Sequence, residues 1–112
     1  MAVLAQEVTK IICVADSSLS LQSKYFTISG MGTDFEQNGY YVWIDVDNAG
    51  TDPEPSSATG IEVNIGEDDS GSQVATAVST AIALKADFST SVSTTNVTVT
   101  NAVRGSTTNA AN

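Results

Sequence analysis

Residues 40–55, YYVWIDVDNAGTDPEP, decide the fold of this chain. Six of the first seven residues are aromatic or β-branched, which is typical of a β-strand. The remainder is acidic, and Pro53 and Pro55 exclude regular pairing in a sheet, so the strand is expected to run out into a loop. Side chains alternate between the two faces of a strand. One face is predicted to enter the core and holds Tyr40, Val42, Ile44 and Val46, and the other holds Tyr41, Trp43, Asp45 and Asp47.

The sequence on both sides of this stretch predicts five further strands and one helix. Alternating or β-branched runs predict the strands, and apolar residues at the helical spacing predict the helix within residues 66–87. Consecutive strands with a single helix are typical of an α+β fold. We expect a mainly antiparallel β-sheet or sandwich with one amphipathic helix packed on it. The predicted strands, in order with the helix after the fourth, are 8–14, 24–29, 40–46, 60–65, 88–94 and 96–101.

The predicted helix has its own terminal signals. Ser70 or Ser72 is expected to cap its first turn. The acidic run 67–69 before the helix and Lys85 near its end are expected to complement the helix dipole. An alanine-rich stripe that suits close packing on a sheet is formed by Val74, Ala77, Val78, Ala81 and Ile82.

The length of the chain indicates a single domain, and its charge indicates that this domain is acidic. The 112 residues suit a single domain, which we place at 8–105, between an N-terminal arm, 1–7, and a C-terminal arm, 106–112. Thirteen acidic and four basic side chains give a net charge of −9. Nucleic acid and membranes are therefore not expected as partners, because phosphate groups and anionic lipids attract clustered lysine and arginine.

The residue types that catalysis needs are scarce. The chain has no histidine and one cysteine, so no imidazole can activate a serine or the thiol, and no intrachain disulfide can form. That cysteine, Cys13, lies in an apolar run and is expected to be a small buried residue. We expect neither enzymatic activity nor a cofactor.

The acids after the central strand form a weak candidate for a metal site. The run DVDNAG resembles the opening of a calcium-binding loop, with Asp45, Asp47 and Asp52 as candidate ligands. However, Ala49 occupies the fifth position of that loop, and Ser56 occupies the twelfth, where a bidentate glutamate belongs. We therefore expect a solvated turn rather than a metal site.

The aromatic side chains opposite the core face require a cover. Tyr41 and Trp43 would be covered by the helix, by a second sheet layer or by another chain. Tryptophan and tyrosine are enriched at the centres of protein interfaces. If another chain provides the cover, the predicted interface residues are Tyr41, Trp43, Phe35 and Met31.

Several segments, taken as a set, resemble a known module. They are KYFTISG, YYVWIDVDNAGTDPEP, TGIEVNI, QVATAVSTAI and NVTVTNAVRGSTTNAA, and they cover roughly residues 8–111. Their order is similar to that of a module found in tailed-bacteriophage virion proteins. The resemblance implies a structural component of the particle, with no catalytic residues to carry over.

Within that resemblance, the leading expectation is a capsid decoration, or cement, protein that stabilises the head. Its expected partners are copies of itself, as a trimer or hexamer, and other virion proteins such as the major capsid protein. It would be made in the host bacterial cytoplasm and located in the virion, and the two arms would become ordered on neighbouring subunits. One alternative is a tail, neck or fibre component. Another is a carbohydrate- or calcium-binding module that uses Trp43, Tyr41 and the nearby acids.

Overall fold

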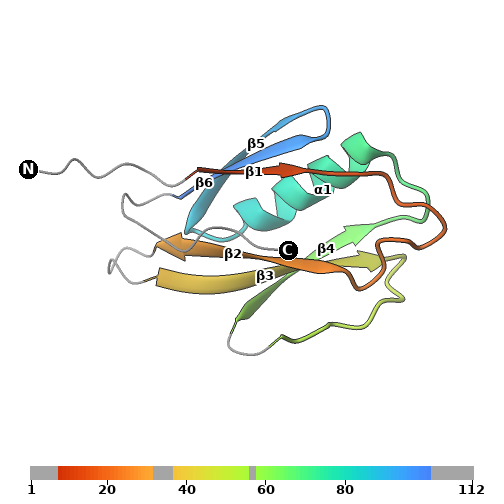
Figure 1. The fold of residues 1–112 in the computed structure, drawn as a ribbon, viewed down its shortest axis with the longest axis horizontal. Helices are drawn as coiled ribbons and strands as arrows, with labels where there is room; N and C mark the ends of the chain where they lie inside the picture. The colour runs from red at the N-terminus through yellow and green to blue at the C-terminus, as the bar shows by residue number, and fades with distance from the viewer. Residues whose placement is uncertain (1–7, 32–36, 56–57, 102–112) are drawn as a thin grey trace, which may run out of the picture.

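The computed structural model describes residues 8–31, 37–55 and 58–101, and this part contains six strands and one helix in the predicted order (Figure 1). The α+β fold class is therefore confirmed. The elements are β1 (Val8–Ile12), β2 (Tyr25–Met31), β3 (Gln37–Val46), β4 (Thr59–Ile65), α1 (Gly71–Ala83), β5 (Phe88–Ser93) and β6 (Asn96–Asn101).

The strands form two three-stranded sheets. One has the order β1-β6-β5 and is antiparallel throughout. The other has the order β2-β3-β4, in which β2 pairs antiparallel with β3 and β4 pairs parallel with it. Parallel neighbours need a crossover of about a dozen residues. The connection runs through residues 47–58, and its described residues, 47–55 and 58, form a loop where such connections are usually helices.

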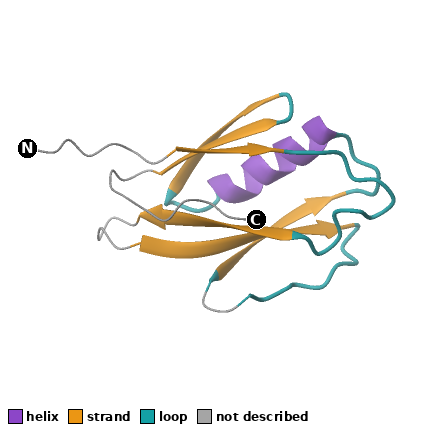
Figure 2. Ribbon diagram, viewed as in Figure 1, coloured by secondary structure: helices purple, strands orange, loops and turns teal. Residues whose placement is uncertain are grey.

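The helix lies between the two sheets and contacts β4 from one sheet and β5 and β6 from the other (Figure 2). Alanine at two of its buried positions allows this close approach. The helix is too short to cross a membrane, and the described part holds none that is long and apolar enough to do so. Its buried residues are Val74, Ala75, Val78, Ala81 and Ile82, which confirms most of the predicted stripe.

The core faces of the strands agree with the predicted alternation. Val42 and Val46 of β3 are fully buried against the helix side, as are Val63 of β4 and Val97 of β6. Cys13 is also buried, as expected, and burial raises the pKa of its thiol.

The helix begins at a capping box, which confirms Ser70 as the cap. Ser70 Oγ accepts a hydrogen bond from the Gln73 amide at 3.3 Å, and Gln73 Oε1 accepts one from the Ser70 amide at 2.8 Å. The acids 67–69 precede the cap and Lys85 follows the C-cap Leu84, so none of them lies within the first or last turn, and their effect on the dipole stays a prediction. The acids also shape the turn before the helix: Asp69 Oδ2, for example, accepts from the Gly66 amide at 2.8 Å.

Candidate functional site

The face of β3 that points away from the helix is buried within the chain. Tyr41 and Trp43 are each 5% exposed, and Asp45 is 6% exposed. The crossover loop is attached to this face. The Gly50 amide donates to Asp45 Oδ1 at 2.8 Å, and the Tyr41 hydroxyl donates to Asp52 Oδ1 at 2.7 Å. The cover of this face is therefore intramolecular, and at Tyr41 and Asp45 the crossover loop contributes to it.

Tyr41 is held tightly at its position. It pairs with Gly60 of β4, and a Cβ atom added at Gly60 would lie 2.7 Å from the tyrosine hydroxyl oxygen. The ring of Tyr25 meets the Tyr41 ring edge-on, with centroids 6.3 Å apart. The hydrogen bond to Asp52, followed by desolvation and the charge of this carboxylate, raises the pKa of Tyr41 to about 12. The side chain is thus a packed structural element of the outer face.

The three candidate metal ligands do not converge. Asp45 is bonded to Gly50, and Asp52 accepts from both Tyr41 and the Glu54 amide. Asp47 Oδ1 instead accepts from the Glu67 amide at 3.3 Å. Across residues 8–31, 37–55 and 58–101, no three His, Cys, Asp or Glu side chains are grouped so that they could hold a metal ion. These carboxylates stabilise turns.

One pair of carboxyl groups, Glu62 and Asp45, resembles the pairs that act in general acid–base catalysis. Desolvation, and after it hydrogen bonding to Asp45, raises the pKa of Glu62 on β4. A carboxyl group with a raised pKa beside a second one is a common arrangement in hydrolytic sites. Here Asp45 is buried under the crossover loop and is already bonded to Gly50. The pair therefore has no open face on the Asp45 side at which a substrate would bind.

The predicted interface residues fall into two groups. Tyr41 and Trp43 are both buried within the chain, so a partner would reach them only if the residues that cover them moved. Phe35 lies outside the described residues, and Met31 ends β2 with a side chain that is also outside them. The interface role of these four residues stays a prediction.

A different surface carries exposed apolar side chains that the sequence interpretation missed. Ile12 is 71% exposed and Val14 is 60% exposed. A signal was present in the run VTKIICV, because its apolar residues occupy both alternating faces, whereas a half-buried strand has polar residues on one face. The β1 patch consists of the exposed apolar residues on β1 and the segment that follows it, namely Val8, Ile12, Val14 and Leu19.

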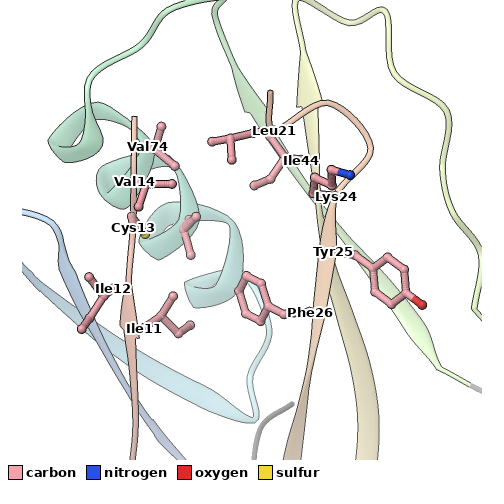
Figure 3. Close-up of a pocket in the computed structure, with 11 residues that line it drawn as sticks. Ile11, Ile12, Cys13, Val14, Leu21, Lys24, Tyr25, Phe26, Ile44 and Val74 are labelled. Carbon is pink, nitrogen blue, oxygen red and sulfur yellow. The ribbon is translucent and has the colours of Figure 1, made fainter. Parts of the chain in front are cut away.

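Beside the β1 patch, a groove of about 170 Å³ opens between β1 and β2 (Figure 3). Its two walls are β1 and β2, which are the outer strands of their sheets within the described part of the chain, and Ile11 and Phe26 point toward one another across it. Helix residues Val74 and Val78 also line this space. Among the described residues that line it, Lys24 alone is charged. We call this feature the β1–β2 groove.

The backbone of β1 is oriented to accept another strand at this groove. The Cys13 amide donates to the Thr95 carbonyl at 2.8 Å. Because hydrogen-bonded pairs alternate along an antiparallel ladder, the N–H and C=O groups of Lys10 and Ile12 point away from β6. No strand of the described part pairs with that edge of β1. An edge of this kind is a template for pairing with another chain segment.

Comparisons of this chain with protein-family models, with curated proteins and with solved structures each found no match.

Proposed function

We propose that this chain is a non-enzymatic structural subunit of a bacteriophage particle, and specifically a capsid decoration protein that stabilises the head. The proposal combines the resemblance of residues 8–111 to a phage virion module with one structural observation. That observation is the β1 patch, where apolar side chains are exposed beside an apolar groove. Exposed apolar side chains beside an apolar groove are common at sites that bind other proteins.

The state of the acidic side chains supports a structural role. Asp16, Asp45 and Asp52 each accept hydrogen bonds from backbone amides or from a tyrosine hydroxyl. Their oxygen atoms accept hydrogen bonds that stabilise loops, and this is a structural role for a carboxylate. The same bonds would have to break before these groups could take part in a reaction.

The net charge of −9 also bears on how such a subunit assembles. Copies of an acidic chain repel one another in solution, which keeps unassembled subunits apart. Assembly therefore requires an attractive surface that is not acidic. The β1 patch and the β1–β2 groove supply one, because their side chains are apolar; Lys10 lies on β1 and Lys24 lines the groove, while Asp16 lies beside the Leu19 end of the patch.

A tail, neck or fibre component is the alternative within the same class, and it would use the same surface. The carbohydrate- or calcium-binding alternative depended on an accessible Trp43 and on converging acids. Trp43 is 5% exposed, so its ring offers no open face on which a sugar could stack. No observation favours that alternative over a structural subunit.

The copy number of the chain in purified virions tests the proposal. Quantitative mass spectrometry against the major capsid protein is expected to find hundreds of copies per particle. A few copies to a few dozen would instead indicate a tail or neck component. Absence of the chain from washed particles, in a preparation whose other structural proteins are complete, would overturn the proposal.

A further inference from the structure

We propose that the crossover loop, through its described residues 47–55, is a proton-dependent cover of the face of β3 that points away from the helix. The loop is held closed while Glu62 of β4 carries a proton, and it loosens when Glu62 ionises. This device is independent of a role in a virion, because every contact that it uses lies within one chain.

The middle of the loop is attached to this face by two hydrogen bonds that end on carboxylates. The Gly50 amide donates to Asp45 Oδ1 at 2.8 Å, and the Tyr41 hydroxyl donates to Asp52 Oδ1 at 2.7 Å. A Cβ atom added at Gly50 would lie 3.0 Å from Asp45 Oδ1, so the loop backbone approaches this carboxylate closely. A segment attached by individual hydrogen bonds of this kind can open locally while the core stays folded.

Carboxyl groups from the sheet and from the loop meet at this attachment. In the pairing of β3 with β4, Trp43 lies opposite Glu62 and Asp45 lies opposite Asn64, so the two acids are diagonal neighbours on one face. Glu62 is hydrogen-bonded to Asp45, and the loop adds the charge of Asp52 nearby. A bond to Asn64 favours the ionised form of Glu62 and is outweighed by these neighbours.

The three lysines of the described residues lie elsewhere. Lys10 is on β1 in the other sheet, Lys24 lines the β1–β2 groove, and Lys85 follows the C-cap of α1. Tyr25 lies opposite Trp43 in the pairing of β2 with β3, so Lys24, one position earlier, points to the other face of its sheet. Closing the loop therefore brings carboxylates together with no lysine of the described residues on the same face.

Two titratable groups report this excess of negative charge. Desolvation raises the pKa of Glu62, and so do its hydrogen bond to Asp45 and the charges of Asp45 and Asp52. The pKa of Tyr41 is raised to about 12, by its bond to Asp52 first and also by the charges of Asp52 and Glu54. Both directions are those that nearby negative charge produces.

Proton binding by Glu62 and closure of the loop are thermodynamically linked through Asp52. Opening the loop moves the charge of Asp52 away from Glu62, so the pKa of Glu62 is higher in the closed state than in the open one. By reciprocity, a proton on Glu62 favours closure. Closure is therefore fullest below the ordinary glutamate value of 4.5, and it weakens as the pH rises through the higher value of the closed state. The open state exposes the Tyr41 hydroxyl.

Hydrogen exchange of the Gly50 amide tests this device in the full-length chain. Its protection is compared with that of the Cys13 amide, which donates to the Thr95 carbonyl at 2.8 Å in the other sheet. The ratio of the two protection factors is expected to fall about threefold from pH 4.5 to pH 7.5, since exposed charges interact weakly through solvent. Glu62→Gln is expected to abolish this fall, because glutamine donates to Asp45 at every pH.

A matched control and a salt series separate charge from structure. Glu67→Gln removes one exposed carboxylate from the turn before α1, and it is expected to leave the fall unchanged. In 1 M NaCl, where the screening length is about 3 Å, the fall in the wild type is expected to shrink. A Glu62→Gln variant whose ratio falls as steeply as that of the wild type would overturn the proposal. A Gly50 amide that is unprotected at every pH would do the same.

The carboxyl carbon resonance of Glu62 gives a direct second measurement. Its titration midpoint is expected to lie above 4.5 in the wild type and to move down in Asp52→Asn. Asparagine at this position keeps an oxygen that can accept from the Tyr41 hydroxyl but removes the loop charge. A midpoint at or below the ordinary value, or one that Asp52→Asn leaves unchanged, would show that the loop and the proton on Glu62 are not linked.

Discussion

The hydroxyl of Tyr41 donates to Asp52 Oδ1 across 2.7 Å and thereby joins strand β3 to the loop that crosses over it. Asp52 accepts a second bond from the Glu54 amide at 2.9 Å, so the same carboxylate also shapes the loop. The bond explains why an aromatic residue on the outer face of a sheet is 5% exposed in a chain of 112 residues. It also makes the loop sensitive to the protonation state of a tyrosine.

The first prediction is a loss of stability at high pH. The hydrogen bond to Asp52 is the main cause that raises the pKa of Tyr41 to about 12, and burial is the main cause that raises the pKa of Tyr40 to about 12. An unfolded tyrosine titrates near 10. Because the folded state holds these protons more tightly, the stabilisation is complete below about pH 10 and is lost as the pH rises toward 12. Urea unfolding at steps from pH 8 to pH 11.5 measures this loss.

Substitution separates the two tyrosines in that experiment. Tyr41→Phe is expected to be less stable than the wild type at pH 8 and to lose less stability on going to high pH. Tyr40→Phe is expected to behave in the same way, since the Tyr40 hydroxyl donates to Asp87 Oδ2 at 2.8 Å. A double variant whose stability still falls as steeply as that of the wild type would contradict this account.

The second prediction concerns Gly60, which lies beneath the Tyr41 ring. Gly60→Ala would place a Cβ atom 2.7 Å from the tyrosine hydroxyl oxygen and 2.8 Å from Cζ, so the ring must move. Overpacking of this kind costs about 1–3 kcal/mol of unfolding free energy. Gly66→Ala is the matched control, because the nearest atom to its added Cβ would be 3.4 Å away. Equal stability of the two variants in urea would show that the ring is not confined.

Local patterns in the sequence predicted most of the fold. The alternation in 40–46 identified β3, the spacing of Val74, Val78 and Ile82 identified α1, and two short β-branched runs identified the β5–β6 hairpin. Each of these signals depends on residues within one element, where the periodicity of strand or helix decides which side chains are buried. The sequence within each element was therefore sufficient to predict these strands and the helix.

Contacts between distant segments were not predictable in this way. The parallel pairing of β3 with β4 follows from a loop crossover, and nothing in residues 47–58 specifies its direction. The Asp68 amide donates to Asp16 Oδ2, although 52 positions separate them, so the acidic run before α1 was assigned to the dipole instead. The β1–β2 groove is formed by two strands from different sheets, and nothing in the sequence of either strand specifies the other as its neighbour.

The third prediction is that Asp16 makes stability depend on acid. Its carboxylate accepts from the amides of Leu19, Leu21 and Asp68 at 3.2, 3.0 and 3.0 Å. These bonds, that from Asp68 foremost, lower the pKa of Asp16. Its stabilisation is therefore present above the unfolded value near 3.9 and is lost as the pH falls through the lower folded value. Asp16→Asn is expected to be less stable at pH 7, because one amide oxygen cannot replace two carboxylate oxygens.

The shape of the pH dependence checks this assignment. Between pH 5 and pH 2, the stability of Asp16→Asn is expected to fall less than that of the wild type, measured by urea unfolding at each pH. Glu67→Gln serves as the control, since it removes an exposed carboxylate from the same region. Parallel curves for Asp16→Asn and the wild type would refute the role of Asp16.

The fourth prediction distinguishes the two serines that the sequence offered as helix caps. Ser70→Ala removes the side-chain acceptor for the Gln73 amide and leaves one end of the capping box unpaired. The loss of an N-cap serine costs about 1 kcal/mol of unfolding free energy, within a range of about 0.5–2. Ser72→Ala lies one position into the first turn and is expected to change stability by less than about 0.5 kcal/mol, because an exposed helical serine contributes little beyond its propensity.

Urea unfolding of both variants gives the comparison, with Ser70→Gly as a third variant. Glycine at a cap costs a few tenths of a kcal/mol relative to serine, so Ser70→Gly should lie between the wild type and Ser70→Ala. An order in which Ser72→Ala is the least stable of the three would mean that the helix begins two residues later than the structure shows.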